Sequence, residues 1–419
     1  MNATGLATTA PPEQGTTTPA SGGSRLALRY SVASFGAGLF YGFNSATLPL
    51  ILSRFTGNTL LIGLLSSTRS IEGTVIQPLI GGWSDRIWSR LGRRRPFMAI
   101  GIPLSALFFI LAAHTPNLPA LVAAIVLFSL LFNVAVDPYN ALLADLFPPD
   151  QRSAVTGLAK VIEFVGTIGV VLGGAELARR DRINLTFYLV AIGMVLAFAA
   201  TIATVRESRV PRGGDERPAL SLREQVAHLL RHRMAFRFLI CLFCFRFGSN
   251  AIQPYLTLFA IHVLATDEGV AQYLFLTLAL ATGLLLAPAG LLAARRGRLA
   301  VLMLGIGGTA ITALGGLAVR NVPQTVVIAI LAGAFNAAIT ATDWPLLSEL
   351  VPPEETGVFA GLKTAFESVA IPASVVVSSQ LINLWGYRAI FGVLTVGSFA
   401  ALALLRTIRP PVAEPVATP

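Results

Sequence analysis

Long, uninterrupted apolar segments restrict what this chain can fold into more than any other feature of its sequence. A helix needs about 20 apolar residues to cross a bilayer, and only helices or closed barrels cross lipid with their backbone polar groups satisfied. The segments are continuous rather than alternating, so we predict helices. The twelve predicted spans are 28–53, 59–83, 97–115, 118–147, 151–178, 183–205, 234–262, 268–293, 299–319, 322–351, 356–384 and 386–406.

Charged residues make up only 12% of the chain, whereas soluble domains carry about 25%. The net charge is +10, and a basic balance can indicate binding to nucleic acid. Here the arginines lie mostly in alternate loops, which is the pattern of membrane topology, and no soluble basic face remains. We therefore predict an all-α integral membrane protein that contacts the lipid bilayer and no nucleic acid.

The distribution of arginine between the loops predicts the orientation of the spans. Cytoplasmic loops carry an excess of Lys and Arg, and an even number of spans puts both ends of the chain on one side. We predict a multi-pass protein of the cell (inner) membrane with both termini in the cytoplasm. The predicted cytoplasmic side holds Arg25, Arg29, Arg86, Arg90, Arg93, Arg94, Arg95, Arg152, the basic residues of 206–237, Arg295, Arg296, Arg298, Arg406 and Arg409. The opposite side holds Arg54, Arg179, Arg180, Arg182, Arg320 and Arg388, of which the cluster at 179–182 departs from the rule.

An internal repeat divides the chain into two related halves. The segment DLFPPDQRSAVTGLAKVIE at Asp145–Glu163 matches ELVPPEETGVFAGLKTAFE at Glu349–Glu367 at a constant offset of 204, and Pro49 corresponds to Pro254 at offset 205. Each half holds six spans, so both halves enter the membrane from the same side, and such parallel repeats enclose a cavity near the midplane. The predicted parts are a disordered tail (1–24), a six-helix bundle (25–205), a linker with an amphipathic helix (206–233), a second six-helix bundle (234–408) and a disordered tail (409–419).

The loop after the second predicted span carries the most specific motif, GGWSDRIWSRLGRRRPF from Gly81 to Phe97. Its glycines permit a tight turn, and its basic run faces the anionic leaflet. The motif resembles the loop signature of the major facilitator superfamily. The longer stretch IQPLIGGWSDRIWSRLGRRRPF resembles, within that superfamily, the sucrose transporters and the wider glycoside–pentoside–hexuronide cation symporters. DPYNALLAD, from Asp137 to Asp145, resembles the fourth-span pattern of the same group, so the direct resemblance covers roughly residues 60–165.

The resemblance implies the major facilitator fold, with two pseudo-symmetric six-helix bundles, and coupled symport. Asn140 stands where sucrose transporters carry an arginine, and Tyr41 and Asn44 stand where melibiose-type members carry acidic residues. The resemblance also implies a gate on the cytoplasmic side, because a charge pair between the halves would have to break when the cavity opens inward. The gate residues are Asp85, Arg86 and Arg93.

Ionisable residues inside the spans are costly, so they usually face a cavity or one another. Lys160 and Glu163 have the spacing of a local pair, as do Arg69 and Glu72. The carboxylates exceed the cations by one, and that carboxylate is available for a coupling proton. Fixed salt bridges that hold the halves together are the alternative. The set is Arg69, Glu72, Asp137, Lys160, Glu163, Arg246, Asp343, Lys363 and Glu367.

Amide and aromatic side chains accompany these charges within the spans. A sugar needs amides and carboxylates for its hydroxyls and an aromatic face for its ring, although each asparagine alone is equally consistent with a bond between helices. We predict that these side chains complete the site for substrate and ion. They are Tyr41, Asn44, Asn133, Asn140, Asn250, Gln253, Asn336 and Trp344.

The sequence predicts a secondary active transporter that moves a sugar or glycoside by proton- or sodium-coupled symport through alternating access. An exporter of amphipathic compounds and a non-transporting pigment-delivery or assembly member of the same fold are the alternatives. We find no nucleophile triad, phosphate loop or metal cluster, so we expect neither an enzyme nor a cofactor. We read the glycine pairs Gly169–Gly173 and Gly357–Gly361 as packing within a monomer.

Overall fold

The computed structural model of the chain describes residues 21–67, 88–207, 231–352 and 355–408. Within these ranges, nine helices are long and apolar enough to cross a membrane, and Ala389–Leu405 is a shorter apolar helix. The N-terminal half contains α1 (Ser21–Gly42), the π-helix η1 (Phe43–Thr47), α2 (Leu48–Phe55), α3 (Thr59–Ser66), α5 (Arg95–Ala113), α6 (Leu118–Leu146), α7 (Pro149–Arg179) and α8 (Leu185–Thr204). The C-terminal half contains α10 (Arg233–Asn250), α11 (Leu256–Leu264), α12 (Glu268–Arg296), α13 (Arg298–Ala318), α14 (Val322–Glu349), α15 (Thr356–Trp385) and α16 (Ala389–Leu405).

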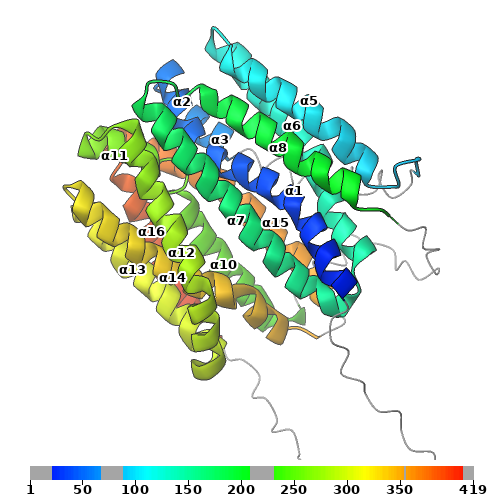
Figure 1. Cartoon of the computed structure of the whole chain (residues 1–419). Coiled ribbons are helices and arrows are strands. Elements are labelled where there is room, and N and C mark those ends of the chain that lie inside the picture. Colours follow the sequence, from blue (N-terminus) through cyan, green and yellow to red (C-terminus); the bar gives the residue numbers. More distant parts are fainter. Residues whose placement is uncertain (1–20, 68–87, 208–230, 353–354, 409–419) are drawn as a thin grey trace, which may run out of the picture.

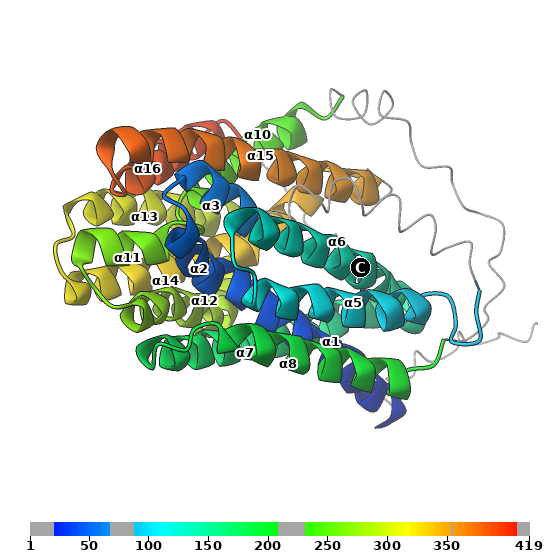
Figure 2. The ribbon, with the colours of Figure 1, turned by 90° about the horizontal axis from the view of Figure 1, so that it is seen from above.

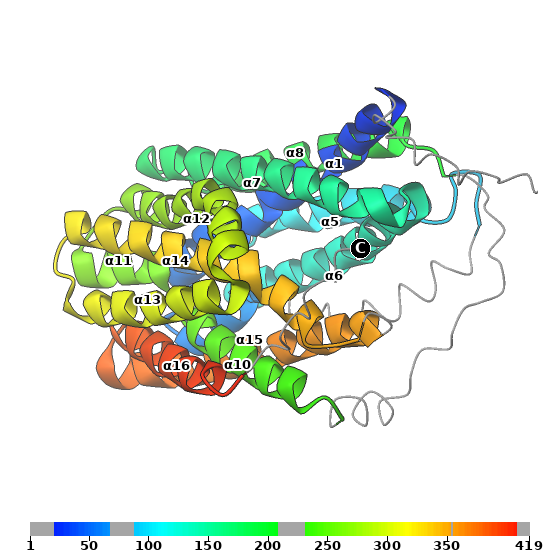
Figure 3. The same cartoon turned by 90° about the horizontal axis from the view of Figure 1, so that it is seen from below.

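The helices of each half form a bundle, and the two bundles lie side by side with their long helices roughly aligned (Figure 1). Seen from below, α1 and α5–α8 lie on one side, and α10–α16 lie on the other (Figure 3). We name the two ends of the molecule by the arginines found there. The Arg54 end contains the loops that follow α2, α5, α7, α11, α13 and α15, and the Arg93 end contains the loops that precede α5, α7, α13 and α15.

Most predicted spans correspond to described helices, and the differences lie at their ends and at two irregular segments. Helix α1 begins at Ser21, inside the segment predicted as tail. The predicted span 59–83 is described only through α3, because its remainder lies outside the described residues. Most of the predicted linker, both tails beyond 21–408, and the amphipathic helix also lie outside them.

The repeat is visible in how the helices begin and end. Asn117 and Asn321 stand at offset 204, and each caps its helix by accepting a backbone N–H, from Ala120 and Gln324 respectively. Each is followed by a proline in the first turn, a position where the missing N–H costs nothing. The ends of these helices match as well, since Asp145 on α6 accepts from Arg93 and Arg94 at the start of α5, and Glu349 on α14 accepts from Arg298 at the start of α13.

The repeat-related prolines, Pro49 and Pro254, lie where two predicted spans depart from regular α-helix. Proline lacks an N–H and its ring collides with the carbonyl four residues earlier. In the first span the helix widens into η1 just before Pro49. In the seventh predicted span the turn Ala251–Tyr255 separates α10 from α11. The predicted continuous helix 234–262 is therefore wrong at this turn, whereas the predicted span 28–53 lies within one continuous span, Gly23–Phe55, which η1 widens without breaking.

Glycine allows α1 and α7 to approach very closely. A Cβ at Gly38 would lie 1.8 Å from the Glu163 carbonyl oxygen, and one at Gly166 would lie 2.2 Å from the Phe35 carbonyl oxygen. The predicted packing role of Gly169 and Gly361 is wrong, because a Cβ at either position meets nothing within 4 Å. The close contact between α1 and α7 therefore depends on Gly38 and Gly166 instead.

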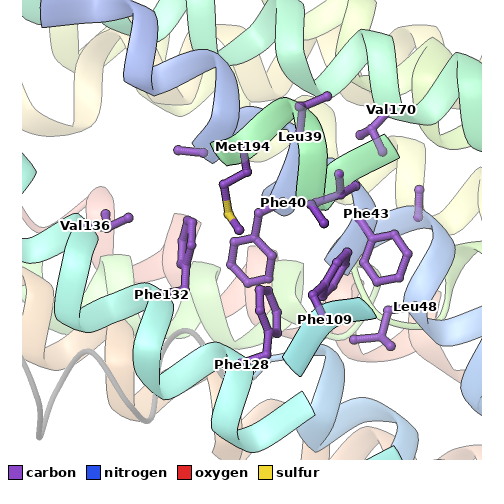
Figure 4. Packing of buried hydrophobic residues seen from close by; sticks show 14 of the residues in the cluster. Leu39, Phe40, Phe43, Leu48, Phe109, Phe128, Phe132, Val136, Val170 and Met194 are labelled. Atoms are coloured by element: carbon purple, nitrogen blue, oxygen red, sulfur yellow. The ribbon is translucent and has the colours of Figure 1, made fainter. Parts of the chain in front are cut away.

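An aromatic cluster fills the N-terminal bundle (Figure 4). The rings of Phe40 and Phe132 lie 4.2 Å apart between centroids, and those of Phe109 and Phe128 lie 4.4 Å apart. Met194 packs among them from α8. Such pairs contribute about 0.5–1.5 kcal/mol beyond their buried area, so this cluster fixes α1 against α5, α6 and α8.

The two halves are joined at the Arg54 end by an apolar core and by polar contacts. Tyr255, Leu258 and Phe259 of the C-terminal half belong to the same buried cluster as Leu48 and Ile51 of the N-terminal half. Figure 2 shows α2 and α3 lying against the C-terminal bundle near α11. The halves are therefore tightly packed at this end.

Helices α7 and α12 join the halves from the Arg54 end toward the middle of the molecule. Helices α7 and α12 are in contact from Arg179 and Gly269 as far as Phe164 and Gly283. Lys160 lies further along α7, about 16 Å from the start of that helix, and its side chain is 61% exposed. A lysine at such depth is stable only where water or a carboxylate reaches it, and here the Glu163 carboxylate lies 2.8 Å from its Nζ.

Candidate functional site

A cavity of about 320 Å³ lies inside the C-terminal half, between α10, α12, α13, α14 and α16. Four of the residues predicted for the site line it: Arg246, Asn250, Gln253 and Asn336. The expected cavity lay between the two halves, whereas this one is lined by the C-terminal half alone. Its volume is within the range of small-molecule sites, about 300–1,000 Å³.

The cavity wall offers hydrogen-bond acceptors from three amides. The NH2 groups are occupied by protein: Asn250 donates to the Arg246 carbonyl at 2.7 Å, Gln253 to Ser45 Oγ at 3.0 Å, and Asn336 to Thr282 Oγ1 at 3.4 Å. The amide oxygens have no protein partner among the described residues and remain available to a ligand. Phe245, Phe275 and Phe391 supply aromatic surface in the same wall. This combination suits a molecule with several hydroxyls and one apolar face.

Four charges from three helices form a closed network beside the cavity. Arg246 on α10 donates to Glu367 at 3.0 Å and to Asp343 at 3.2 Å. Lys363 on α15 lies 2.9 Å from Glu367 and 3.3 Å from Asp343. Each cation thus contacts both carboxylates, so the network has no net charge. Arg246 belongs to both the network and the cavity wall.

The N-terminal half contributes a separate ion pair. Lys160 Nζ lies 2.8 Å from Glu163 Oε2, as the i, i+3 spacing predicts. The close contact at Gly38 holds the backbone of Glu163 against α1, and Thr167 donates to the Gly38 carbonyl one turn further along. The pair is therefore positioned by backbone contact, and the Lys160 side chain is exposed.

The predicted polar face of α6 is only partly exposed. Asn133 is buried and donates to the Ser129 carbonyl at 3.0 Å, whereas Asn140 is exposed. Asp137 is half-buried between them. Tyr41 packs edge-on against Phe132, with centroids 5.9 Å apart. These residues share the N-terminal half with Lys160 and Glu163, and none of them lines the C-terminal cavity.

Two predicted residues take other roles in this structure. Asn44 is buried in η1 and donates to the Ser66 carbonyl at 2.6 Å, so it joins the first span to α3. Trp344 is 39% exposed and does not line the cavity. Four further predicted residues lie outside the described residues: Arg69, Glu72, Asp85 and Arg86.

The described part of the predicted gate is held within one half. Arg93 and Arg94 donate to Asp145 at 2.7 and 3.2 Å. The Glu207 carboxylate accepts the backbone N–H groups of Arg93, Arg94 and Arg95 at 2.7–3.1 Å. It thereby caps α5 with a negative charge, where the helix dipole favours one. The role of Arg93 as a gate stays a prediction.

The sequence analysis did not find the polar contacts that join the halves at the Arg54 end. Arg54 donates three hydrogen bonds to the Glu268 carboxylate, at 2.8–3.0 Å. Thr47 donates to Gln272 at 3.0 Å, and Thr59 donates to Asn383 at 3.0 Å. Glu268 and Gln272 lie in the first turns of α12, and only the fold brings them to the first span. The one sequence feature that indicates a contact at this end is Arg54, a basic residue on the side that is poor in arginine.

Comparison with known proteins identifies the family. A profile of the family described as MFS/sugar transport protein matches residues 32–413. The chain belongs to this family. Membership confirms the predicted major facilitator fold.

Three relatives of this MFS protein are sugar transporters by name. Proton-associated sugar transporter A of Homo sapiens is 26% identical over 209 residues, which cover 44% of this chain and 28% of the relative. Sucrose transport protein SUC3 of Arabidopsis thaliana is 32% identical over 128 residues, covering 25% and 22%. General alpha-glucoside permease of Schizosaccharomyces pombe is 27% identical over 164 residues, covering 34% and 30%. The matched part is less than a third of each relative's length.

Solved structures support the fold over nearly the whole chain. A mutant of the nucleoside transporter NupG has a TM-score of 0.74 at 14% identity, covering 91% of this chain and 99% of that one. A bacterial homologue of the human lysosomal transporter Spinster, in an inward-facing and unoccupied conformation, has a TM-score of 0.71 at 12% identity, covering 93% and 99%. At such identities the likeness is evidence for the MFS fold alone.

Proposed function

We propose that this MFS protein imports a sugar or glycoside by cation-coupled alternating access. The observation that carries the proposal is the C-terminal cavity, whose wall combines one guanidinium, three amide oxygens and three phenyl rings. A polyhydroxylated ring both donates and accepts hydrogen bonds and has an apolar face, so it satisfies all three kinds of group. The names of the relatives agree with this substrate class.

The proposed orientation puts the Arg93 end in the cytoplasm. Arginines gather in the loops of that end, including Arg93, Arg94, Arg95, Arg298 and the pair Arg295–Arg296, and cytoplasmic loops carry such an excess. The Arg54 end is then the outer end. In this orientation the contacts between the halves would close the outer end, as expected for one of the two states of alternating access.

The proposed coupling site is the Lys160–Glu163 pair. A proton or sodium ion on Glu163 would weaken its attraction to Lys160, and the close contact with Gly38 would pass that change to α1. The first span carries η1, which contacts both Gln253 and Gln272 of the other half. The cation thus acts on the N-terminal half, while the substrate binds the C-terminal half.

Uptake into proteoliposomes tests the proposal. Purified protein is assayed with a panel of mono- and disaccharides and glucosides under an imposed proton or sodium gradient. Asn250→Ala and Asn336→Ala should each weaken substrate binding about 2- to 10-fold, as expected for one lost hydrogen bond. Asn184→Ala is the matched control, because Asn184 is exposed at the Arg54 end and its side chain caps nothing. Absence of uptake for every solute, or equal effects of all three variants, would falsify the proposal.

Export of an amphipathic compound is the second candidate. The observation in its favour is the apolar share of the cavity wall, where Leu256, Leu274 and Leu278 accompany the three phenylalanines. Resistance of expressing cells to such compounds, without gradient-driven sugar uptake, would favour it. A cavity of this size with polar groups in its wall argues against a non-transporting assembly factor.

A further inference from the structure

Two irregular segments from opposite halves meet in the middle of the closed part of the protein. One is η1 in the first span, and the other is the turn Ala251–Tyr255 between α10 and α11. Both precede or contain a repeat-related proline, Pro49 or Pro254. Helices that are broken by proline or by a π-helix often mark functional sites, because freed backbone groups and bends concentrate there.

Gln253 is the point of contact between these segments. Its Nε2 donates to Ser45 Oγ in η1 at 3.0 Å. The same side chain lines the C-terminal cavity and is exposed there. Gln253 therefore belongs at once to the contact between the halves and to the wall of the candidate substrate site.

A second hydroxyl–amide bond, nearby, has only one of these properties. Thr47 of η1 donates to Gln272 of α12 at 3.0 Å. Gln272 is fully buried and does not line the cavity. Both bonds join a hydroxyl of η1 to a glutamine of the C-terminal half, although the Gln253 amide donates and the Gln272 amide oxygen accepts. The Thr47 bond therefore shows what a contact between the halves without access to the cavity looks like.

We propose that Gln253 links occupancy of the cavity to closure of the Arg54 end. This inference rests on the proposed function, because the occupant is the polyhydroxylated substrate. In the empty protein the Gln253 amide binds Ser45 and ties the halves together. A substrate hydroxyl in the cavity competes with Ser45 for the Gln253 N–H donor. The hydrogen bond between Gln253 and Ser45 weakens when Gln253 donates to the substrate.

The exchange is favourable because neither partner is left without a hydrogen bond. Ser45, once released, can donate to the carbonyl four residues earlier in its own helix, as serine in membrane helices commonly does. Gln253 keeps a partner because the substrate replaces Ser45. By contrast, Gln272 has no ligand within reach, and separation from Thr47 would leave a buried amide unpaired. Substrate therefore acts on the Gln253 contact and not on the Gln272 contact.

The test measures the distance between the halves at the Arg54 end. Spin labels at Gly57 and Leu384 report it, because both positions are exposed and lie on opposite halves. The background is Cys241→Ala/Cys244→Ala, which removes the two native cysteines. Ser45→Ala leaves the cavity wall intact, since Ser45 does not line the cavity. Thr47→Val is the matched control.

Without ligand, Ser45→Ala and Thr47→Val should each raise the population with widely separated labels, by about 2- to 10-fold as expected for one hydrogen bond. When a sugar that the wild type transports is added, the population with widely separated labels should rise further in the wild type and in Thr47→Val. Ser45→Ala should bind the same sugar with unchanged affinity but show a clearly smaller shift. Gln253→Ala should lose both the hydrogen bond to Ser45 and part of the affinity for the sugar.

The proposal is overturned if Ser45→Ala leaves the ligand-free distances unchanged, or if it responds to sugar as fully as Thr47→Val does. Failure of the proposed function gives a different result. In that case no sugar binds the wild type, while the ligand-free comparison of Ser45→Ala with wild type still decides whether the tie exists.

Discussion

At the scale of single residues, the charges in the C-terminal half explain how four ionisable groups persist inside a membrane protein. Each is neutralised by two neighbours of opposite sign, and none of the four side chains is more than 26% exposed. Removing one member of a buried network costs more than the network itself contributes, because the remaining charges stay behind unbalanced. The stability of the network therefore depends more on equal numbers of positive and negative charges than on any single contact.

Glu367→Gln should lower stability, and a second substitution should restore it. The single variant leaves Arg246 and Lys363 to share Asp343, at a cost of about 1–3 kcal/mol because the site is partly accessible to water. Glu367→Gln/Lys363→Gln removes one charge of each sign and should recover most of that loss. Thermal unfolding of the purified protein in detergent measures both. A double variant that melts below the single variant would contradict the balance argument.

Glu163→Gln should uncouple transport from the cation gradient. The neutral amide cannot take up a proton or bind sodium as a carboxylate does, so gradient-driven accumulation should be lost while exchange of sugar across the membrane continues. Parallel assays of accumulation and exchange in proteoliposomes separate the two. Glu176→Gln is the control, because Glu176 lies on the same helix and pairs with Arg180 in water. Coupled accumulation that survives in Glu163→Gln would remove this residue from the coupling site.

The sequence alone could predict which residues are charged and polar inside the spans, and which local pairs they form. Lys160 with Glu163 follows from helical spacing. The bonds of Arg246 to Asp343 and Glu367 could not be predicted in this way, because three helices far apart in the chain have to meet first. For the same reason, Asn44 was assigned to a substrate site although its amide joins two helices of one half.

At the scale of helices, the apolar runs predict where the spans lie, but they predict neither the widened segment η1 nor the turn Ala251–Tyr255. The length of an apolar run predicts how many residues can lie in the lipid, but it does not predict whether the helical backbone hydrogen bonds continue through the run. Pro49 and Pro254 were noticed as a repeat-related pair. Their physical consequence, a helix that widens or breaks next to the ring, follows from the missing N–H and could have been inferred.

The glycine contact between α1 and α7 gives a sharp prediction at this scale. Gly38→Ala puts a methyl group where the Glu163 carbonyl now lies, so α1 and α7 have to move apart. Overpacking costs about 1–3 kcal/mol, occasionally more, and the displacement should also reduce coupled uptake. Thermal unfolding and uptake assays measure the two effects.

Gly169→Ala is the matched control for this experiment, on α7 itself. A Cβ at Gly169 meets no atom within 4 Å, so the variant should keep wild-type stability or gain up to about 1 kcal/mol from helix propensity. Equal losses in Gly38→Ala and Gly169→Ala would show that the helices do not depend on this contact.

At the scale of the whole molecule, the repeat predicted two like bundles but not how they meet. The capping residues Asn117 and Asn321 and the acidic residues Asp145 and Glu349 recur in both halves. The contacts between the halves are not repeated in this way. They use Arg54 and Glu268, whose side chains the repeat does not relate, so only the assembled structure reveals them.

The Arg54–Glu268 pair should favour the state in which the Arg54 end is closed. It joins the halves through a bidentate contact, but both side chains are partly in water, at 40% and 24% exposure. Its contribution is therefore about 0.2–1 kcal/mol, which corresponds to roughly a 1.4- to 5-fold change in population. Arg54→Gln and Glu268→Gln should each increase, by that factor, the population in which the spin labels at Gly57 and Leu384 are widely separated.

The exchanged pair Arg54→Glu/Glu268→Arg should restore the closed population, because the attraction is kept with its sign reversed. The effect of the single variants should shrink as salt is raised, since exposed charges are screened within about 10 Å at 0.1 M. Arg180→Gln is the control: it breaks an ion pair at the same end, to Glu176, that lies within one helix. If Arg180→Gln separates the labels as far as Arg54→Gln does, loss of positive charge at this end, and not the bond between the halves, sets the equilibrium between the two states.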